Sequence, residues 1–154
     1  MLPEMAWREF KSSREIACTP ARAFTYIADY RNVHSVLEGV TRWRPLGRKT
    51  TGVGARFEVE IRTLGIPLGN VLVLDAWKPS RLISWESESG LLSQRGSWTF
   101  EPSAEGVRVT LRIAYEPPGA AIGNLLASRV DSVVRGRLAA ALAQMAEVLE
   151  EPAG

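Results

Sequence analysis

Residues 117–150 read PPGAAIGNLLASRVDSVVRGRLAAALAQMAEVLE and carry the pattern that decides the fold of this chain. Apolar residues recur there with the 3.6-residue period of a helix that has one broad apolar face. At 1.5 Å per residue, roughly 30 residues form a rod of about 45 Å. Such a helix buries nothing by itself, so it must lie along another layer of the protein. The apolar face consists of Ile122, Leu125, Leu126, Val130, Val133, Val134, Leu138, Leu142, Met145, Val148 and Leu149.

The chain before this helix has mostly the pattern of β-strands. Apolar and polar residues alternate, and short turns separate the alternating segments, which indicates an antiparallel meander. Two short helices are expected at 20–28 and 32–37, the first after a Thr19 cap. We therefore predict an α+β helix-grip fold: a seven-stranded curved antiparallel sheet wrapped around the long C-terminal helix, with two short helices between strands 1 and 2. The expected strands are 5–18, 40–46, 54–63, 68–77, 81–88, 94–101 and 106–115.

Composition excludes several classes of protein. The chain of 154 residues is 45% hydrophobic and 23% charged, as in ordinary globular proteins, and we expect one domain, 1–154. A net charge of +2 without a Lys/Arg run argues against a nucleic-acid partner. The single Cys18 excludes an internal disulfide, and the single His34 excludes a site with two histidine ligands. We expect no metal, no cofactor, no transmembrane segment, no secretory signal and a cytoplasmic location.

Five segments and the closing helix carry a family resemblance by their order and spacing. They are REIACTPARAFTYIADYRNV (14–33), LEGV (37–40), GVGARFEVEI (52–61), LDAWKPSRLISW (74–85) and RGSWTFEPSAEGVRVTLRIAYEPPG (95–119). Together they resemble the START-like superfamily with its helix-grip fold, and in particular the polyketide cyclase/dehydrase-like proteins. The resemblance implies that an apolar, aromatic or lipid-like small molecule binds in a cavity between the sheet and the C-terminal helix.

The inward-facing side chains are the candidates for the lining of that cavity. Several large aromatic residues on one face suit a flat or apolar ligand. The alternative is that the same residues fill a solid core. By parity, the polar groups on this face are Asp75, Ser87, Gln94 and the Tyr115 hydroxyl. The expected ligand-binding residues are Leu37, Val40, Phe57, Val59, Ile61, Val71, Val73, Ile83, Trp85, Trp98, Leu111, Ile113, Tyr115, Leu126, Arg129, Val130 and Val133.

One alternative to simple ligand binding is enzymatic. The cavity would then cyclise or dehydrate a polyketone, with Asp75 and Tyr115 as catalytic proton-transfer groups and Arg129 stabilising the developing enolate. The resemblance implies that aromatic polyketide cyclases carry Arg and Tyr side chains in the pocket. The positions that match them by spacing here are Val40, Trp77 and Ser87, which do not reproduce that set.

A second alternative is a partner-binding or quinone-chaperone protein, because some members of the superfamily have such roles. Exposed apolar residues in GAAIGNLLA (119–127) or near Trp7 would then form the contact surface. The expected oligomeric state is a monomer or a homodimer. On the long helix, Asp131 and Arg135 have the i, i+4 spacing of a surface ion pair.

Overall fold

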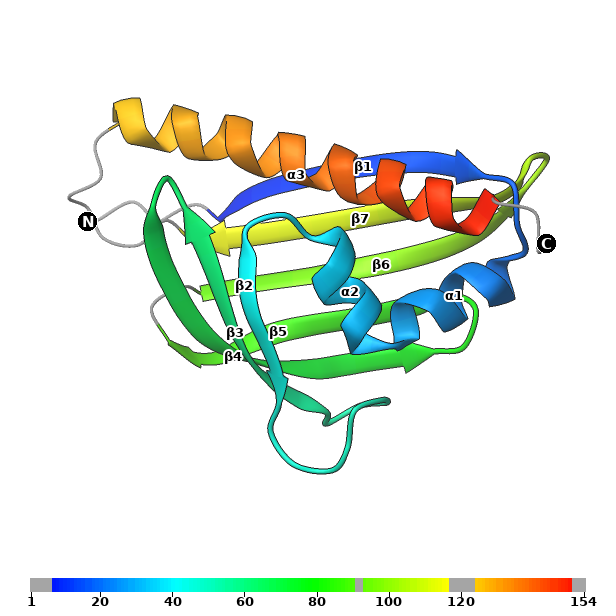
Figure 1. Cartoon of the computed structure of the whole chain (residues 1–154), viewed down its shortest axis with the longest axis horizontal. Helices are drawn as coiled ribbons and strands as arrows, with labels where there is room; N and C mark the ends of the chain where they lie inside the picture. Colours follow the sequence, from blue (N-terminus) through cyan, green and yellow to red (C-terminus); the bar gives the residue numbers. More distant parts are fainter. Residues whose placement is uncertain (1–6, 91–92, 117–123, 151–154) are drawn as a thin grey trace.

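The seven strands of the protein form one antiparallel sheet, and the computed structural model describes residues 7–90, 93–116 and 124–150. The strand order is β1-β7-β6-β5-β4-β3-β2. The sheet follows the chain as a meander except that β1 lies beside β7 at one edge (Figure 1). The elements are β1 (Arg8–Ile16), α1 (Pro20–Ala28), α2 (Tyr30–Val36), β2 (Val40–Pro45), β3 (Arg56–Thr63), β4 (Ile66–Lys78), β5 (Leu82–Gly90), β6 (Ser93–Ser103), β7 (Gly106–Glu116) and α3 (Asn124–Glu150).

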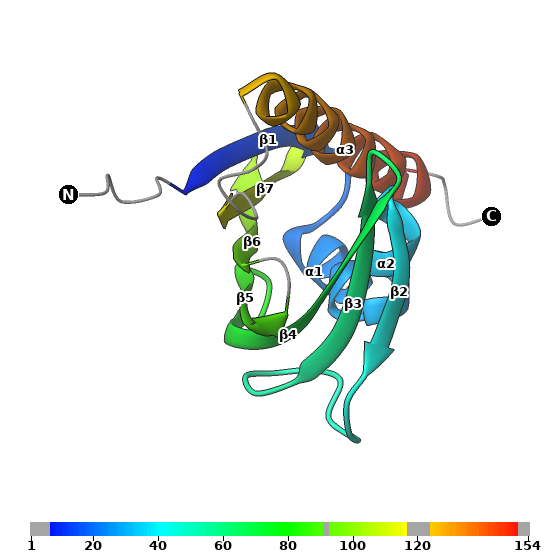
Figure 2. The same ribbon diagram turned by 90° about the vertical axis from the view of Figure 1, so that its left-hand side faces the viewer.

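The sheet curls around an interior that α3 closes on one side. Viewed from the end, β5, β4 and β3 turn away from β1 and β7 and come back toward α3 (Figure 2). The helix α3 runs lengthwise beside β1, and α1 and α2 fill one end of the interior (Figures 1 and 2). This arrangement confirms the predicted helix-grip fold, including the two short helices between the first two strands.

Side-chain caps fix the starts of the two short helices. The Thr19 hydroxyl accepts a hydrogen bond from the Arg22 backbone N–H at 3.1 Å, and Pro20 follows as the first helical residue. The Asp29 carboxylate accepts one from the Arg31 backbone N–H at 3.0 Å. Because Asp29 is the cap, α2 begins at Tyr30, two residues before the predicted start.

The hairpin between β3 and β4 is tighter than the sequence pattern suggested. Thr63 pairs with Ile66, so Leu64 and Gly65 alone form the turn. Both have positive φ angles, 51° and 80°, as a two-residue hairpin with a mirror-image turn requires. We expected a turn that included Ile66, but β4 begins at that residue.

The expected inward face of β4 was wrong. Val71 is paired with Glu58, and Val73 with Arg56, on the outer face, whereas Leu72 is buried and lies opposite the inward Phe57. Both faces of this strand are apolar, so alternation alone does not identify the inner one. Asp75 is exposed beside an irregularity in the β4–β5 pairing. The inward residues of this part of β4 are Leu68, Asn70, Leu72 and Leu74.

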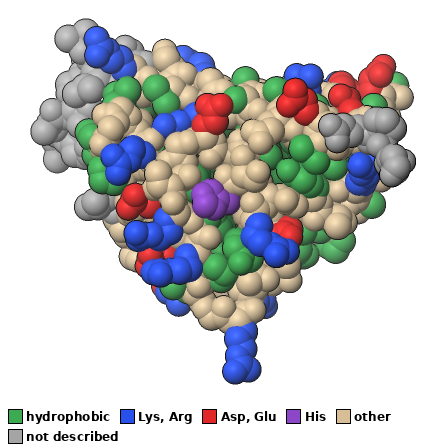
Figure 3. Space-filling view, in the orientation of Figure 1, with side chains coloured by type: hydrophobic (Ala, Val, Ile, Leu, Met, Phe, Trp, Pro, Cys, Tyr) green, Lys and Arg blue, Asp and Glu red, His purple; other side chains and the backbone are tan. Residues whose placement is uncertain are grey.

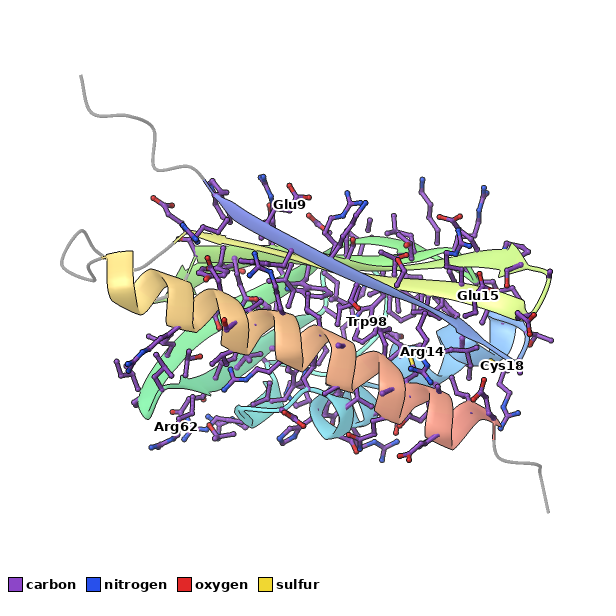
Figure 4. The ribbon with its side chains drawn as sticks, turned by 90° about the horizontal axis from the view of Figure 1, so that it is seen from above. Glu9, Arg14, Glu15, Cys18, Arg62 and Trp98 are labelled. Atoms are coloured by element: carbon purple, nitrogen blue, oxygen red, sulfur yellow. The ribbon has the colours of Figure 1, made fainter. Side chains whose placement is uncertain are left out.

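The C-terminal half of α3 packs into a closed core. Leu142, Met145 and Leu149 are almost completely buried against the sheet. Trp98, on β6, is buried in the interior, whereas Glu9 and Glu15 on β1 project outward (Figure 4). Core packing is close at Gly96, where an added Cβ would overlap the Trp85 indole ring. No helix within the described ranges is long and apolar enough to cross a membrane.

Candidate ligand-binding cavity

A cavity of about 330 Å³ lies between the N-terminal half of α3 and the concave side of the sheet. Its walls come from α3, from the link between α2 and β2, from the β3–β4 hairpin, and from β6 and β7. Leu64 and Ile66 line it and are also exposed, so the hairpin forms part of its rim. The lining residues are Leu37, Glu38, Val40, Ile61, Thr63, Leu64, Ile66, Leu68, Gln94, Ile113, Tyr115, Val130, Val134, Arg137 and Leu138.

Only some of the predicted binding residues line this cavity. Most of the predicted aromatic residues instead surround a second space of about 30 Å³, roughly enough for one water. The first group, in the large cavity, is Leu37, Val40, Ile61, Ile113, Tyr115 and Val130. The second group, around the small space, is Phe57, Ile83, Trp85 and Trp98.

The remaining predicted residues lie elsewhere. Val59 and Leu111 are fully buried in the core. Val133 lines neither space, and Arg129 is exposed. Val71 and Val73 face outward, and the side chain of Leu126 lies outside the described part of the structure. The aromatic residues therefore contribute mainly to a solid core, and the large cavity is lined mainly by aliphatic side chains.

Sequence reasoning missed several lining residues. Leu68 was not among the expected lining residues, and the hairpin residues Leu64 and Ile66 lie between two of the expected strands. Arg137 and Leu138 lie one turn or more beyond Val133, the last helix residue in the expected lining. The helical period does place Leu138 on the apolar face of α3. The period does not show, however, which residues of that face line a cavity and which pack into the core.

A polar cluster closes the side of the cavity next to β1. The Tyr115 hydroxyl donates to Asp131 Oδ1 at 3.0 Å, and Arg8 Nε donates to the same oxygen at 2.8 Å. A second guanidinium nitrogen of Arg8 pairs with Asp131 Oδ2. The cluster thus joins β1, β7 and α3 through one carboxylate.

Asp131 is buried, which contradicts its assignment to a surface pair with Arg135. Only 5% of the residue is exposed. The hydrogen bonds from Arg8, above all, lower the pKa of Asp131, although desolvation opposes them. Burial and the bond to Asp131 raise the pKa of Tyr115 far above its usual value. Asp131 is therefore ionised and Tyr115 protonated at neutral pH, and the Tyr115 hydroxyl donates its hydrogen bond to the Asp131 carboxylate.

The other candidate catalytic group lies outside the cavity. Asp75 is on the outer face of β4, where its carboxylate accepts a hydrogen bond from Ser84. Its expected inward orientation was wrong. The single histidine, His34, is on the outer surface (Figure 3). Within residues 7–90, 93–116 and 124–150, no three metal-ligating side chains gather into a possible site.

Two cavity residues present hydrogen-bond donors. Gln94 is 4% exposed, and its Nε2 has no partner among the described residues. Arg137 reaches from α3 to the β3–β4 hairpin, where it donates to Thr63 Oγ1 at 3.2 Å and to the Arg62 carbonyl at 2.5 Å. The guanidinium lies over Gly39, where a Cβ would overlap it. Burial lowers the pKa of Arg137, but the side chain remains charged.

Fold and cavity together define a helix-grip protein with an internal, mainly aliphatic cavity. The chain belongs to the family described as polyketide cyclase/dehydrase and lipid transport, whose sequence model matches residues 8–150. This confirms the resemblance to the polyketide cyclase/dehydrase-like proteins. No curated protein sequence matches the chain.

Solved structures with the same fold cover nearly the whole chain. The protein TTHA0849 from Thermus thermophilus is 22% identical, with a TM-score of 0.79 over 92% of this chain and 97% of its own. The Zhui aromatase/cyclase from a Streptomyces species is 17% identical, with a TM-score of 0.73 over 97% and 99%. A START superfamily protein from Mycobacterium smegmatis is 12% identical, with a TM-score of 0.73 over 92% and 98%. At these identities the likeness concerns the fold.

Proposed function

We propose that this protein binds one apolar, aliphatic or lipid-like small molecule in the cavity between α3 and the sheet. The observation that carries the proposal is the space of about 330 Å³ with its mainly aliphatic lining. A volume of this size lies within the range of small-molecule sites. By contrast, the space among Phe57, Ile83, Trp85 and Trp98 measures only about 30 Å³, too little for such a ligand.

Binding is better supported than polyketone cyclisation. Tyr115 lines the cavity, but its hydroxyl already donates a hydrogen bond to Asp131. Asp75 lies on the opposite face of the sheet. Among the lining residues that the structure describes, Glu38 is the carboxylate, and no histidine, cysteine or serine accompanies it. Neither a cytoplasmic location nor a quinone-chaperone role gains support from the cavity, and both stay predictions.

Titration with N-phenyl-1-naphthylamine tests the proposal. This neutral apolar probe fluoresces more strongly when it leaves water. We expect saturable binding of one molecule per chain, because the large cavity admits one such ligand and the small space does not. Fluorescence that rises without saturation, or that is equal for the folded and the urea-unfolded chain, would contradict the proposal.

A matched pair of variants locates the probe. Leu138→Ala enlarges the cavity, whereas Leu142→Ala, one turn later on α3, removes the same atoms from the closed core. Each is expected to cost about 2–5 kcal/mol of stability. Only Leu138→Ala is expected to change the affinity for the probe, so the comparison separates the cavity from a loss of folding.

A further inference from the structure

We propose that the ligand carries a carboxylate and that Arg137 binds it, so that the natural ligand is an apolar monocarboxylic acid rather than a neutral hydrocarbon. This inference rests on the proposed function, because it concerns the same cavity. The inference adds one charged group, Arg137, that would bind the ligand in a cavity with mainly apolar walls.

The charge of Arg137 is the first observation. Arg8 and Arg137 are the arginines, within the described residues, whose side chains are partly buried rather than exposed. Arg8 has the buried carboxylate of Asp131 as its counter-ion. Arg137 forms no ion pair within 4 Å in the described part of the chain. A partly buried cation without a directly paired counter-ion is costly, and an anionic ligand would offset that cost.

The position of Arg137 is the second observation. Two hydrogen bonds to neutral acceptors, Thr63 Oγ1 and the Arg62 carbonyl, hold the guanidinium at the hairpin. Arg62 itself is on the outer edge of the molecule (Figure 4). These bonds use two of the five N–H donors of the guanidinium, so donors remain for a carboxylate. The side chain lines the cavity and is therefore fixed at the apolar wall in advance of binding.

The negative charge of Glu38 allows a second test of anion binding at Arg137. Glu38 lines the same cavity and acts on Arg137 through space, although it is not within ion-pair distance. A ligand carboxylate beside Arg137 would be repelled by Glu38. Removal of that charge by Glu38→Gln is therefore expected to strengthen binding of an anionic ligand and leave a neutral one unaffected.

Competition by two ligands of one chain length tests the inference. Decanoate and 1-decanol are each titrated against bound N-phenyl-1-naphthylamine at pH 8, where the acid is ionised. Arg137→Gln is expected to weaken decanoate by about tenfold or more, as for loss of a charge-assisted hydrogen bond, and to change 1-decanol by less than about twofold. Arg137→Lys keeps the charge and is expected to retain most of the preference.

The control is Arg135→Gln, which removes an exposed charge from the same helix and is expected to change neither ligand. Equal weakening of both ligands in Arg137→Gln would assign the residue a structural role and overturn the inference. Unchanged affinities in that variant would overturn it too. If neither ligand displaces the probe from the wild type, the proposed function itself fails, and the inference falls with it.

Discussion

Ile113→Trp is expected to weaken binding of N-phenyl-1-naphthylamine by at least about tenfold, which is about 1.4 kcal/mol. Ile113 points inward from β7 and lines the cavity, so the larger indole must occupy the space that the ligand needs. The fold is expected to tolerate the change, because the indole enters an existing cavity rather than a closed core. Fluorescence titration and thermal unfolding of the same samples measure the two effects separately.

Two controls accompany this variant. Val148→Trp adds the same side chain at an exposed position of α3 and is expected to leave affinity unchanged. Leu111→Trp places an indole two residues earlier on the same strand, at a fully buried position, and is expected to destabilise the protein by overpacking. Unchanged affinity in Ile113→Trp with intact folding would place the binding site somewhere other than the cavity.

Asp131→Ala is expected to lower the free energy of unfolding by about 2–3 kcal/mol. The substitution removes the acceptor of the Tyr115 hydroxyl and the counter-ion of Arg8 together. The estimate lies below the usual cost of breaking a buried pair because 39% of the Arg8 side chain is exposed and water screens it. Urea unfolding at pH 7 measures the loss, and Tyr115→Phe, which leaves the ion pair intact, is expected to cost about 1 kcal/mol.

The lowered pKa of Asp131 predicts that the stability of the protein depends on pH. The pKa of Asp131 is lower in the folded protein than in the unfolded chain, where it is about 3.9. The unfolded state therefore binds the proton first, and the contribution of Asp131 is complete above about pH 5 and is lost as the pH falls through the folded pKa. The stability difference between wild type and Asp131→Asn is expected to shrink between pH 5 and pH 3. A constant difference would contradict the ionised cluster.

The sequence was sufficient to predict the order of the elements because period and turn chemistry are local. The start of α1 follows from the Thr19 cap and Pro20, and from Val107 to Ile113 β7 alternates between apolar and polar residues. On β4 the prediction failed because Val71, Leu72, Val73 and Leu74 are all apolar. Only the pairing with β3 and β5 shows which of them face inward.

The candidate site was harder to predict than the fold. A cavity forms where side chains from elements distant in the sequence do not fill the space between them. The sequence of one segment therefore does not indicate its presence. Trp85 and Trp98 were expected in the lining, but the small residue at Gly96 allows Trp85 to pack closely there. Asp131 was assigned to the surface because its partners, Arg8 and Tyr115, are 123 and 16 residues away in the chain.

Nuclear Overhauser contacts between a bound apolar ligand and the methyl groups of the protein test the central claim most directly. For decanoate, we predict contacts from the alkyl chain to Ile113, Val134 and Leu138, which line the cavity from β7 and α3. We predict none to Val148, on the exposed side of α3. Contacts confined to exposed methyl groups, with none to Ile113 or Leu138, would contradict the proposal that this protein binds its ligand between helix and sheet.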